Sequence, residues 1–237
     1  MKSDLPKVLH KLGGKPMVEY VINTAKEAGA ERVILVVGHK WDQAQNSLKH
    51  LKVEFVIQRE QLGTGHAVLQ TQRLLSDFDG DVLILCGDVP LLTSETLKKL
   101  LKEHRKRKAS ATVLTAILDD PSGYGRIIRD EKGLVQKIVE EKDASADQKN
   151  IREINTGTFV FDRGALFSVL EKVTNDNKQG EYYLTDTLKL LQDKKLPIWA
   201  MVTPDPSETL GINSSEELKK VEDILLGRQF NQTEISP

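Results

Sequence analysis

The chain has 237 residues with 34 basic and 35 acidic side chains, and its net charge of -1 gives no reason to expect nucleic acid or a membrane as a partner. Its length fits one large α/β domain, or one domain with an inserted lobe, and no apolar run approaches the roughly 20 residues that cross a bilayer. Cys86 is the single cysteine, which excludes an internal disulfide or a paired-cysteine metal site, and with the absence of a secretory signal it predicts a soluble, cytoplasmic protein.

Short apolar strands alternate with polar helices through the first half of the chain. After a connector over residues 3–15, we expect a helix from Pro16 to Gly29, a buried strand at Arg32–Val37, a helix at Lys40–His50, a strand at Val53–Ile57, a helix ending near Leu75, a strand at Val82–Leu85, a helix from Thr93 or Ser94 to Glu103 and a strand at Ala111–Leu118. Repeated alternation of this kind favours a parallel, right-handed, doubly wound α/β sheet.

The pattern changes after Asp119. Two short alternating runs surround a turn at Asp130–Gly133, which predicts a hairpin in a small inserted antiparallel lobe. The charged segment Glu140–Arg152 is expected to be a mobile surface loop. The remaining expected elements are strands at Glu153–Phe161 and Leu196–Val202, helices at Arg163–Lys172 and Ser214–Leu226, a further helix opening near Asp186, and a frayed polar tail over residues 227–237.

The strand ending at Cys86, Gly87 and Asp88 is the first candidate for a functional site. Its continuous apolar run is typical of a buried parallel strand, and open α/β sheets bind ligands beyond the carboxyl ends of such strands. A carboxylate beside a glycine is suited to holding a divalent cation on phosphate oxygens. An aspartate that only caps the next helix explains the same pattern equally well.

A second candidate is the loop Gln58–Ala67, in which Gly63 and Gly65 bracket Thr64 before a helix. Such a loop can turn backbone amides toward a ligand, although glycine turns before helices are common.

Several ordered motifs together resemble one family. They are MKSDLPKVLHKLGGKPM, QREQLGTGHAV, CGDVPLL, GYGRIIRD, IVEEKDA, EINTG, QGEYYLTD and GIN. The chain over residues 1–224 is similar to the uridyltransferase half of bacterial bifunctional N-acetylglucosamine-1-phosphate uridyltransferases. The resemblance implies a nucleotidyltransferase domain at residues 1–226 with a Rossmann-like nucleotide-diphospho-sugar transferase fold.

The resemblance also implies roles for individual residues. Asp88 and Asn213 would hold Mg²⁺, although Asn213 alone would be interpreted as a helix cap. Lys7 would steady the triphosphate. The uracil would meet Gln58, Gly63 and Thr64, and the nucleotide would lie along Cys86, Gly87 and Asp88. The implied sugar-site residues are Gly125, Glu140 and Asn155, with help from Lys142, Tyr182 and Thr185. His66 is expected to be a packing residue.

The implied reaction is in-line attack by an oxygen of N-acetylglucosamine 1-phosphate on the α-phosphorus of UTP, with pyrophosphate leaving. A related transferase for another nucleotide or sugar phosphate remains an alternative. In the family a strand and a glycine-rich loop of the pattern LAAGxGTRM precede the segment matching Met1, so a non-catalytic fragment that only binds nucleotide sugar is the other alternative. No sequence feature indicates an oligomeric state.

Overall fold

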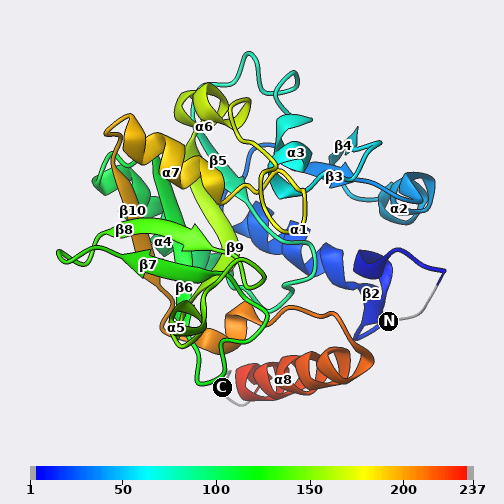
Figure 1. Ribbon diagram of the computed structural model, residues 1–237. Coiled ribbons are helices and arrows are strands. Elements are labelled where there is room, and N and C mark those ends of the chain that lie inside the picture. The colour runs from blue at the N-terminus through cyan, green and yellow to red at the C-terminus, as the bar shows by residue number, and fades with distance from the viewer. Residues whose placement is uncertain (1–3, 234–237) are drawn as a thin grey trace.

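A mixed β-sheet lies at the centre of the protein, with helices packed around it (Figure 1). The computed structural model describes residues 4–233. The strands are β1 (Lys11–Leu12), β2 (Lys15–Pro16), β3 (Ile34–Val37), β4 (Glu54–Ile57), β5 (Asp81–Ile84), β6 (Ala111–Ile117), β7 (Arg126–Arg129), β8 (Val135–Val139), β9 (Glu153–Asp162) and β10 (Ile198–Val202). The helices are η1 (Lys7–Leu9), α1 (Met17–Glu27), α2 (Trp41–Leu48), α3 (Thr64–Leu69), α4 (Ser94–Lys106), α5 (Ala146–Lys149), α6 (Arg163–Leu170), α7 (Asp186–Asp193), η2 (Pro206–Thr209) and α8 (Ser215–Thr233).

The long strand β9 organises the main sheet. Strands β10, β6, β9, β7 and β8 lie in that order, and β5 pairs with the same β9. Both β5 and β6 run antiparallel to β9, so β5 and β6 point the same way, as does β10, which is parallel to β6. Strands β3 and β4 form a separate parallel pair. The predicted α/β class with mostly parallel strand direction is therefore confirmed, with β9 reversed between β5 and β6.

The prediction of a buried parallel strand is wrong for β5. All four of its residues are partly exposed, and its partner β9 is antiparallel to it. The cause is its place in the sheet, because within residues 4–233 β5 has a strand partner on one edge only. The residues of β3, predicted as buried, are partly exposed as well.

Alternating side chains of β9 face two different helical layers. Phe159 and Phe161 are buried against α6 and α7, where Leu166 and Leu188 are fully buried. Val160, between them in sequence, faces Leu97 and Leu100 of α4 and the other half of the core. The two-residue period of a strand explains this division. Hence β9 is covered on both faces, which fits its central position.

The expected hairpin lobe is present. Strands β7 and β8 pair antiparallel, and Arg126 of β7 pairs with Ile154 of β9, so the lobe continues the sheet edge. The loop predicted after it is partly wrong, because α5 forms inside it with a capping box between Ser145 and Gln148. These short-range hydrogen bonds stabilise a helical turn in a segment whose charge-rich composition predicts a loop.

Several helix boundaries differ from the predictions, among them the start of α1 and the ends of α3 and α8. Pro16 precedes α1 as its N-cap residue, and α3 ends at Leu69 instead of Leu75. Helix α8 extends past Leu226 to Thr233, so the prediction of a frayed tail is wrong for residues 227–233, while residues 234–237 lie outside the described part. Arg228 holds this extension by donating to the Leu91 carbonyl at 2.7 Å and to Asp205 at 2.9 Å. No helix among the described residues is long and apolar enough to cross a membrane.

Candidate active site

Three distant parts of the chain meet beyond the carboxyl end of β5. The backbone amide of Ile212 donates to the Asp88 carbonyl at 3.0 Å, which holds the turn containing Asn213 against the loop that follows β5. The Lys7 ammonium, from η1, contacts Asp88 Oδ2 and lies 2.5 Å from Asn213 Oδ1. A carboxylate oxygen and an amide oxygen therefore converge on one cationic group.

Gly87 allows η1 to come this close. A Cβ atom at Gly87 would lie 3.2 Å from Val8 Cγ1 and 3.4 Å from Val18 Cγ2, which is tighter than an ordinary contact. Leu9, which follows Val8 in η1, is only 3% exposed. It packs in an apolar cluster with residues of α1 and α2. The apolar side of η1 thus fixes the helix against the core while Lys7 faces the site.

Helix capping does not explain Asn213. Ser214 caps α8 instead, since its Oγ accepts from the Glu217 amide at 3.1 Å, and the Glu217 carboxylate accepts from the Ser214 amide at 2.8 Å. This reciprocal arrangement is a capping box. The alternative interpretation of Asn213 as the cap is therefore wrong, and its side-chain oxygen is directed to Lys7 instead.

The loop after β4 is held by its own glutamine and by a distant segment. The Gln58 amide donates to the Gly63 carbonyl at 3.1 Å, and Gly63 has a φ of 108°, a conformation that favours glycine. A Cβ at Gly63 would come within 2.7 Å of the Tyr182 carbonyl. Thr64 Oγ1 accepts from the Leu184 amide at 3.0 Å, which ties this loop to the segment before α7.

His66 has hydrogen-bond partners for both ring nitrogens. Nδ1 lies 3.0 Å from the Gln58 amide nitrogen and Nε2 lies 3.1 Å from that of Gln70. This arrangement agrees with the packing role predicted for His66.

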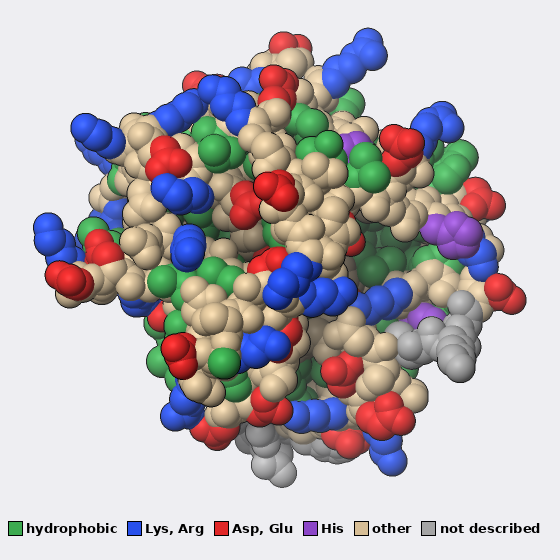
Figure 2. Space-filling model, viewed as in Figure 1, with side chains coloured by type: hydrophobic (Ala, Val, Ile, Leu, Met, Phe, Trp, Pro, Cys, Tyr) green, Lys and Arg blue, Asp and Glu red, His purple; other side chains and the backbone are tan. Residues whose placement is uncertain are grey.

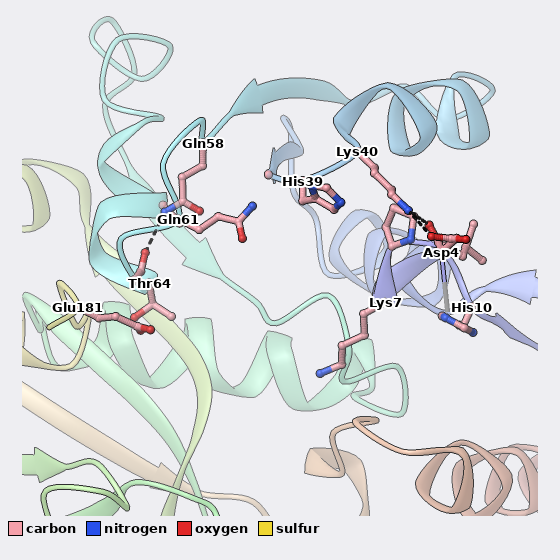
Figure 3. A pocket seen from close by; sticks show the side chains of 14 residues that line it. Asp4, Lys7, His10, His39, Lys40, Gln58, Gln61, Thr64 and Glu181 are labelled. Carbon is pink, nitrogen blue, oxygen red and sulfur yellow. Dashed lines mark hydrogen bonds and ion pairs between the residues drawn. The ribbon is translucent and has the colours of Figure 1, made fainter. Parts of the chain in front are cut away.

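A cavity of about 780 Å³ separates this loop from η1. Figure 2 shows the molecule hollowed on this side, with Lys and Arg side chains along one rim. In Figure 3, Gln58, Gln61 and Thr64 line one wall and Lys7, His39 and Lys40 line the other. One wall carries the Gln58 and Gln61 amides and the Glu181 carboxylate, and the other carries the ammonium groups of Lys7 and Lys40, with Asp4 beside Lys40. A ligand with an anionic part and a hydrogen-bonding ring fits this chemistry.

The three predicted sugar-site residues also lie together, at the base of the hairpin lobe. The backbone N–H of Asn155 donates to the Gly125 carbonyl at 2.8 Å, and a Cβ at Gly125 would be 3.2 Å from Glu140 Oε2. Thr185 Oγ1 donates to Glu140 at 2.9 Å. Burial raises the pKa of the Glu140 carboxyl, and the nearby Asp186 and Asp143 act in the same direction, while the Thr185 hydrogen bond opposes them.

Cys86 links the two groups of residues. Its Sγ contacts the Gly157 carbonyl at 3.6 Å, and a Cβ at Gly157 would lie 2.5 Å from this sulfur. Burial raises the pKa of the Cys86 thiol to about 12, with Asp88 adding to the effect and Lys7 opposing it. The thiol is therefore protonated at neutral pH and serves as a packing group between β5 and β9.

Tyr124 and Lys40 are among the side chains at the site that were not predicted. Tyr124, inside the GYGR motif, has a hydrogen bond to the backbone of Gly211, which connects the hairpin lobe to the turn that carries Asn213. Lys40 lines the cavity from the start of α2. The motif was a usable signal for Tyr124, whereas Lys40 stands in a polar segment with no local pattern.

The donor set at Asp88 bears on which ions fit there. Within the described residues no group of three or more His, Cys, Asp or Glu could hold a metal, so a site rich in nitrogen or sulfur ligands is not indicated there. Asp88 and Asn213 supply two oxygens, which suits a hard cation that takes its remaining ligands from water and phosphate.

Comparison with known proteins places the chain among nucleotidyl transferases. Residues 2–205 match the family model described as nucleotidyl transferase. The chain is 47% identical over 228 residues to the bifunctional protein GlmU of Bacillus subtilis, and 48% identical over 232 residues to that of Listeria monocytogenes serotype 4a. These alignments cover 96% and 98% of this chain and 50% of each relative, so the chain spans about half their length.

A solved structure shares the fold. It is titled the crystal structure of UDP-glucose pyrophosphorylase complexed with UDP-glucose, and it superposes with a TM-score of 0.71 at 19% identity, covering 94% of this chain and 91% of that one. The family model and the GlmU relatives confirm, at the level of the family, the resemblance predicted from the ordered motifs. The chain belongs to the nucleotidyl transferase family.

Proposed function

We propose that this protein is a Mg²⁺-dependent uridyltransferase that forms UDP-N-acetylglucosamine and pyrophosphate from UTP and N-acetylglucosamine 1-phosphate. The observation that carries the proposal is the convergence of Asp88 Oδ2 and Asn213 Oδ1 on one cationic group beyond the end of β5. Family membership supports nucleotidyl transfer, and the similarity to the GlmU proteins supports the choice of substrates. The single cysteine and the nucleotide substrate support a cytoplasmic setting.

Asp88 and Asn213 would hold the metal ion. Both side-chain oxygens already meet at the Lys7 ammonium, so their positions suit a shared cation, and Mg²⁺ prefers oxygen ligands. When bound, the ion supplies neutralisation of phosphate charge.

Positioning and electrostatics would account for the reaction. An oxygen of the sugar phosphate attacks the α-phosphorus, the bond to the β-phosphate bridging oxygen breaks, and pyrophosphate leaves with that electron pair. Lys7 would balance the charge that develops on the leaving group. The attacking oxygen is already anionic, so no general base is needed, and this agrees with the engagement of both His66 nitrogens by glutamines.

The uracil and the sugar would be bound by different groups of residues. Gln58, Gly63 and Thr64 would contact the uracil, because amide and hydroxyl groups can read its donor and acceptor edge. The nucleotide would follow the backbone of Cys86 and Gly87 toward Asp88. Gly125, Glu140 and Asn155 would bind the sugar hydroxyls and the acetamido group.

Pyrophosphate release from UTP and N-acetylglucosamine 1-phosphate tests the proposal, with a titration of Mg²⁺. We expect Asp88→Asn to lower turnover by about 10²- to 10³-fold, because it removes a charge that stabilises the transition state. Its unfolding midpoint should be nearly unchanged, because the ion pair with Lys7 is partly exposed. Asn213→Ala should raise the Mg²⁺ concentration needed for half-maximal activity and should lower turnover less than Asp88→Asn does.

The matched control is Ser214→Ala, one residue beyond Asn213. It removes the cap of α8, worth about 1 kcal/mol, and should lower stability without changing the Mg²⁺ midpoint. Unchanged maximal rate and Mg²⁺ midpoint in Asp88→Asn would reject Asp88 as a ligand.

Substrate choice is tested with the same assay. CTP, dTTP and glucose 1-phosphate should each support slower release than UTP and N-acetylglucosamine 1-phosphate. Preference for another pair would reassign the substrate within the family. Binding of UDP-N-acetylglucosamine with no pyrophosphate release from any pair would instead assign a binding role.

A further inference from the structure

Lys40 has a left-handed backbone conformation in the turn between β3 and α2. Its φ is 56° and its ψ is 38°, in the left-handed region that side chains with a Cβ seldom adopt. It precedes α2 as the N-cap residue, a place where extended backbone is usual. Its side chain makes no capping hydrogen bond to α2.

Two other lysines have a positive φ that their position after a helix explains. Among residues 4–233, Lys108 and Lys195 are the other non-glycine residues with positive φ, at 47° and 59°. Each follows the C-terminus of a helix, where a left-handed residue closes the last turn. The closing hydrogen bonds are present, from the residues after them to His104 and Leu191, at 3.1 and 3.0 Å. Lys40 has no such role, because it stands at the start of a helix.

The side chain of Lys40 reaches a second segment across the cavity rim. Its ammonium donates to the Asp4 carbonyl and lies 3.2 Å from Asp4 Oδ1. The Asp4 carboxylate is fully exposed, whereas the Lys40 side chain is 26% exposed, so the backbone carbonyl is the better-defined partner. Figure 3 shows Lys40 directed to Asp4, with Lys7 pointing away from both into the site.

Asp4 lies on the approach to η1, whose far side is already fixed by apolar contacts. Leu9 packs in the cluster with α1 and α2, and Val8 lies against Gly87. The contact from Lys40 holds the other side, at the start of the segment that carries Lys7. A residue kept in a strained conformation by its surroundings often has a functional reason.

We propose that Lys40 is a positioning residue, which holds the Asp4 backbone so that the Lys7 ammonium is directed to Asp88 and Asn213. The inference rests on the proposed function for the role of Lys7 in turnover. It concerns the ammonium of Lys40, and the left-handed backbone is the conformation that brings this ammonium to Asp4.

The decisive variant is Lys40→Gly. Glycine adopts positive φ without strain, so the turn is retained and the unfolding midpoint should be equal to or higher than that of the unaltered protein. The ammonium is lost, so kcat should fall by about tenfold, with a smaller change in KM for UTP, because misplacement of a charge-stabilising group acts on the transition state. Lys40→Arg keeps a cation of similar reach and should retain most of the rate.

Lys108→Gly and Lys195→Gly are the matched controls. Each makes the same change at positive φ outside the cavity, so each should leave kcat unaltered. A full rate for Lys40→Gly, or an equal loss in the two controls, would overturn the proposal.

A second readout does not depend on the reaction. Labelling of Lys7 by an amine-reactive reagent, followed by mass spectrometry, should be faster in Lys40→Gly than in the unaltered protein, because Lys7 would leave its two oxygen partners more often. Other lysines, including Lys108 and Lys195, should be labelled at unchanged rates. An unchanged Lys7 rate would reject the positioning role even if the protein proves to use other substrates.

Discussion

Glu140 shows how burial at the site makes a single carboxylate dependent on pH. Burial raises its pKa, and Asp186 and Asp143 add to the effect of burial. Because the folded-state pKa lies above the unfolded one, the contribution of Glu140 to stability is full below the unfolded pKa and is lost as the pH rises through the folded pKa.

The matching prediction concerns Glu140→Gln, which keeps the shape without the charge. The free energy of unfolding of this variant should increase relative to that of the unaltered protein as the pH rises from about 4 to about 8. Urea unfolding at a series of pH values measures this difference. The exposed Glu131→Gln in the hairpin turn is the control. A difference that stays constant across the range would contradict the effect of burial.

Cys86 is a second residue whose chemistry is set by its surroundings. With a pKa of about 12, about one thiol in 10⁴ is ionised at pH 8, against roughly a quarter for an ordinary cysteine. We therefore expect a disulfide reagent to label the native protein far more slowly than the urea-unfolded chain. As Cys86 is the single cysteine, the total absorbance change reports on it alone. Labelling at the same rate in both states would show that the thiol is accessible and reactive.

At the scale of elements, the approach of η1 to the loop after β5 depends on one missing side chain. In Gly87→Ala the new methyl group would lie 3.2 Å from Val8 Cγ1, so Val8 must give way by a few tenths of an ångström. A shift of η1 that makes this room would move Lys7 as well. We expect about tenfold slower turnover under the proposed reaction. Adding Val8→Ala makes room and should restore most of the rate, whereas Val8→Ala alone tests the cost of the lost apolar contact. If the double variant is no faster than Gly87→Ala, the effect of Gly87 does not come from the space that it leaves for η1.

The length of α8 supplies another test at this scale. Gly227 is exposed, lies inside α8 and has no atom within 4 Å of a Cβ built on it. Replacing a glycine inside a helix with alanine gains up to about 1 kcal/mol, so Gly227→Ala should raise the urea midpoint. If α8 ended at Leu226, as its sequence suggested, the substitution would leave the midpoint unchanged.

At the scale of the whole molecule, local patterns were sufficient to predict most elements and the class of fold. The candidate residues of the site came from the resemblance carried by the ordered motifs, and in the structure the Lys7 ammonium contacts both Asp88 and Asn213. The direction of β9 could not be predicted, because alternation of side chains is the same in parallel and antiparallel strands. The interpretation of Asn213 as the cap of α8 was avoidable, because Ser214 and Glu217 have the spacing of a capping box in the sequence itself. The left-handed backbone of Lys40 and the contact of its ammonium with Asp4 could not be predicted either, because no local pattern relates these two distant segments.

The place of β9 between β5 and β6 has a consequence for how the chain is made. Both strands leave the ribosome well before their shared partner, since residues 85–152 separate β5 from β9 and residues 118–152 separate β6 from β9. During that interval their edges and apolar side chains lack the strand that covers them, and exposed edges of this kind promote aggregation. We therefore expect nascent chains that end before β9 to aggregate more readily than nascent chains that extend past Asp162.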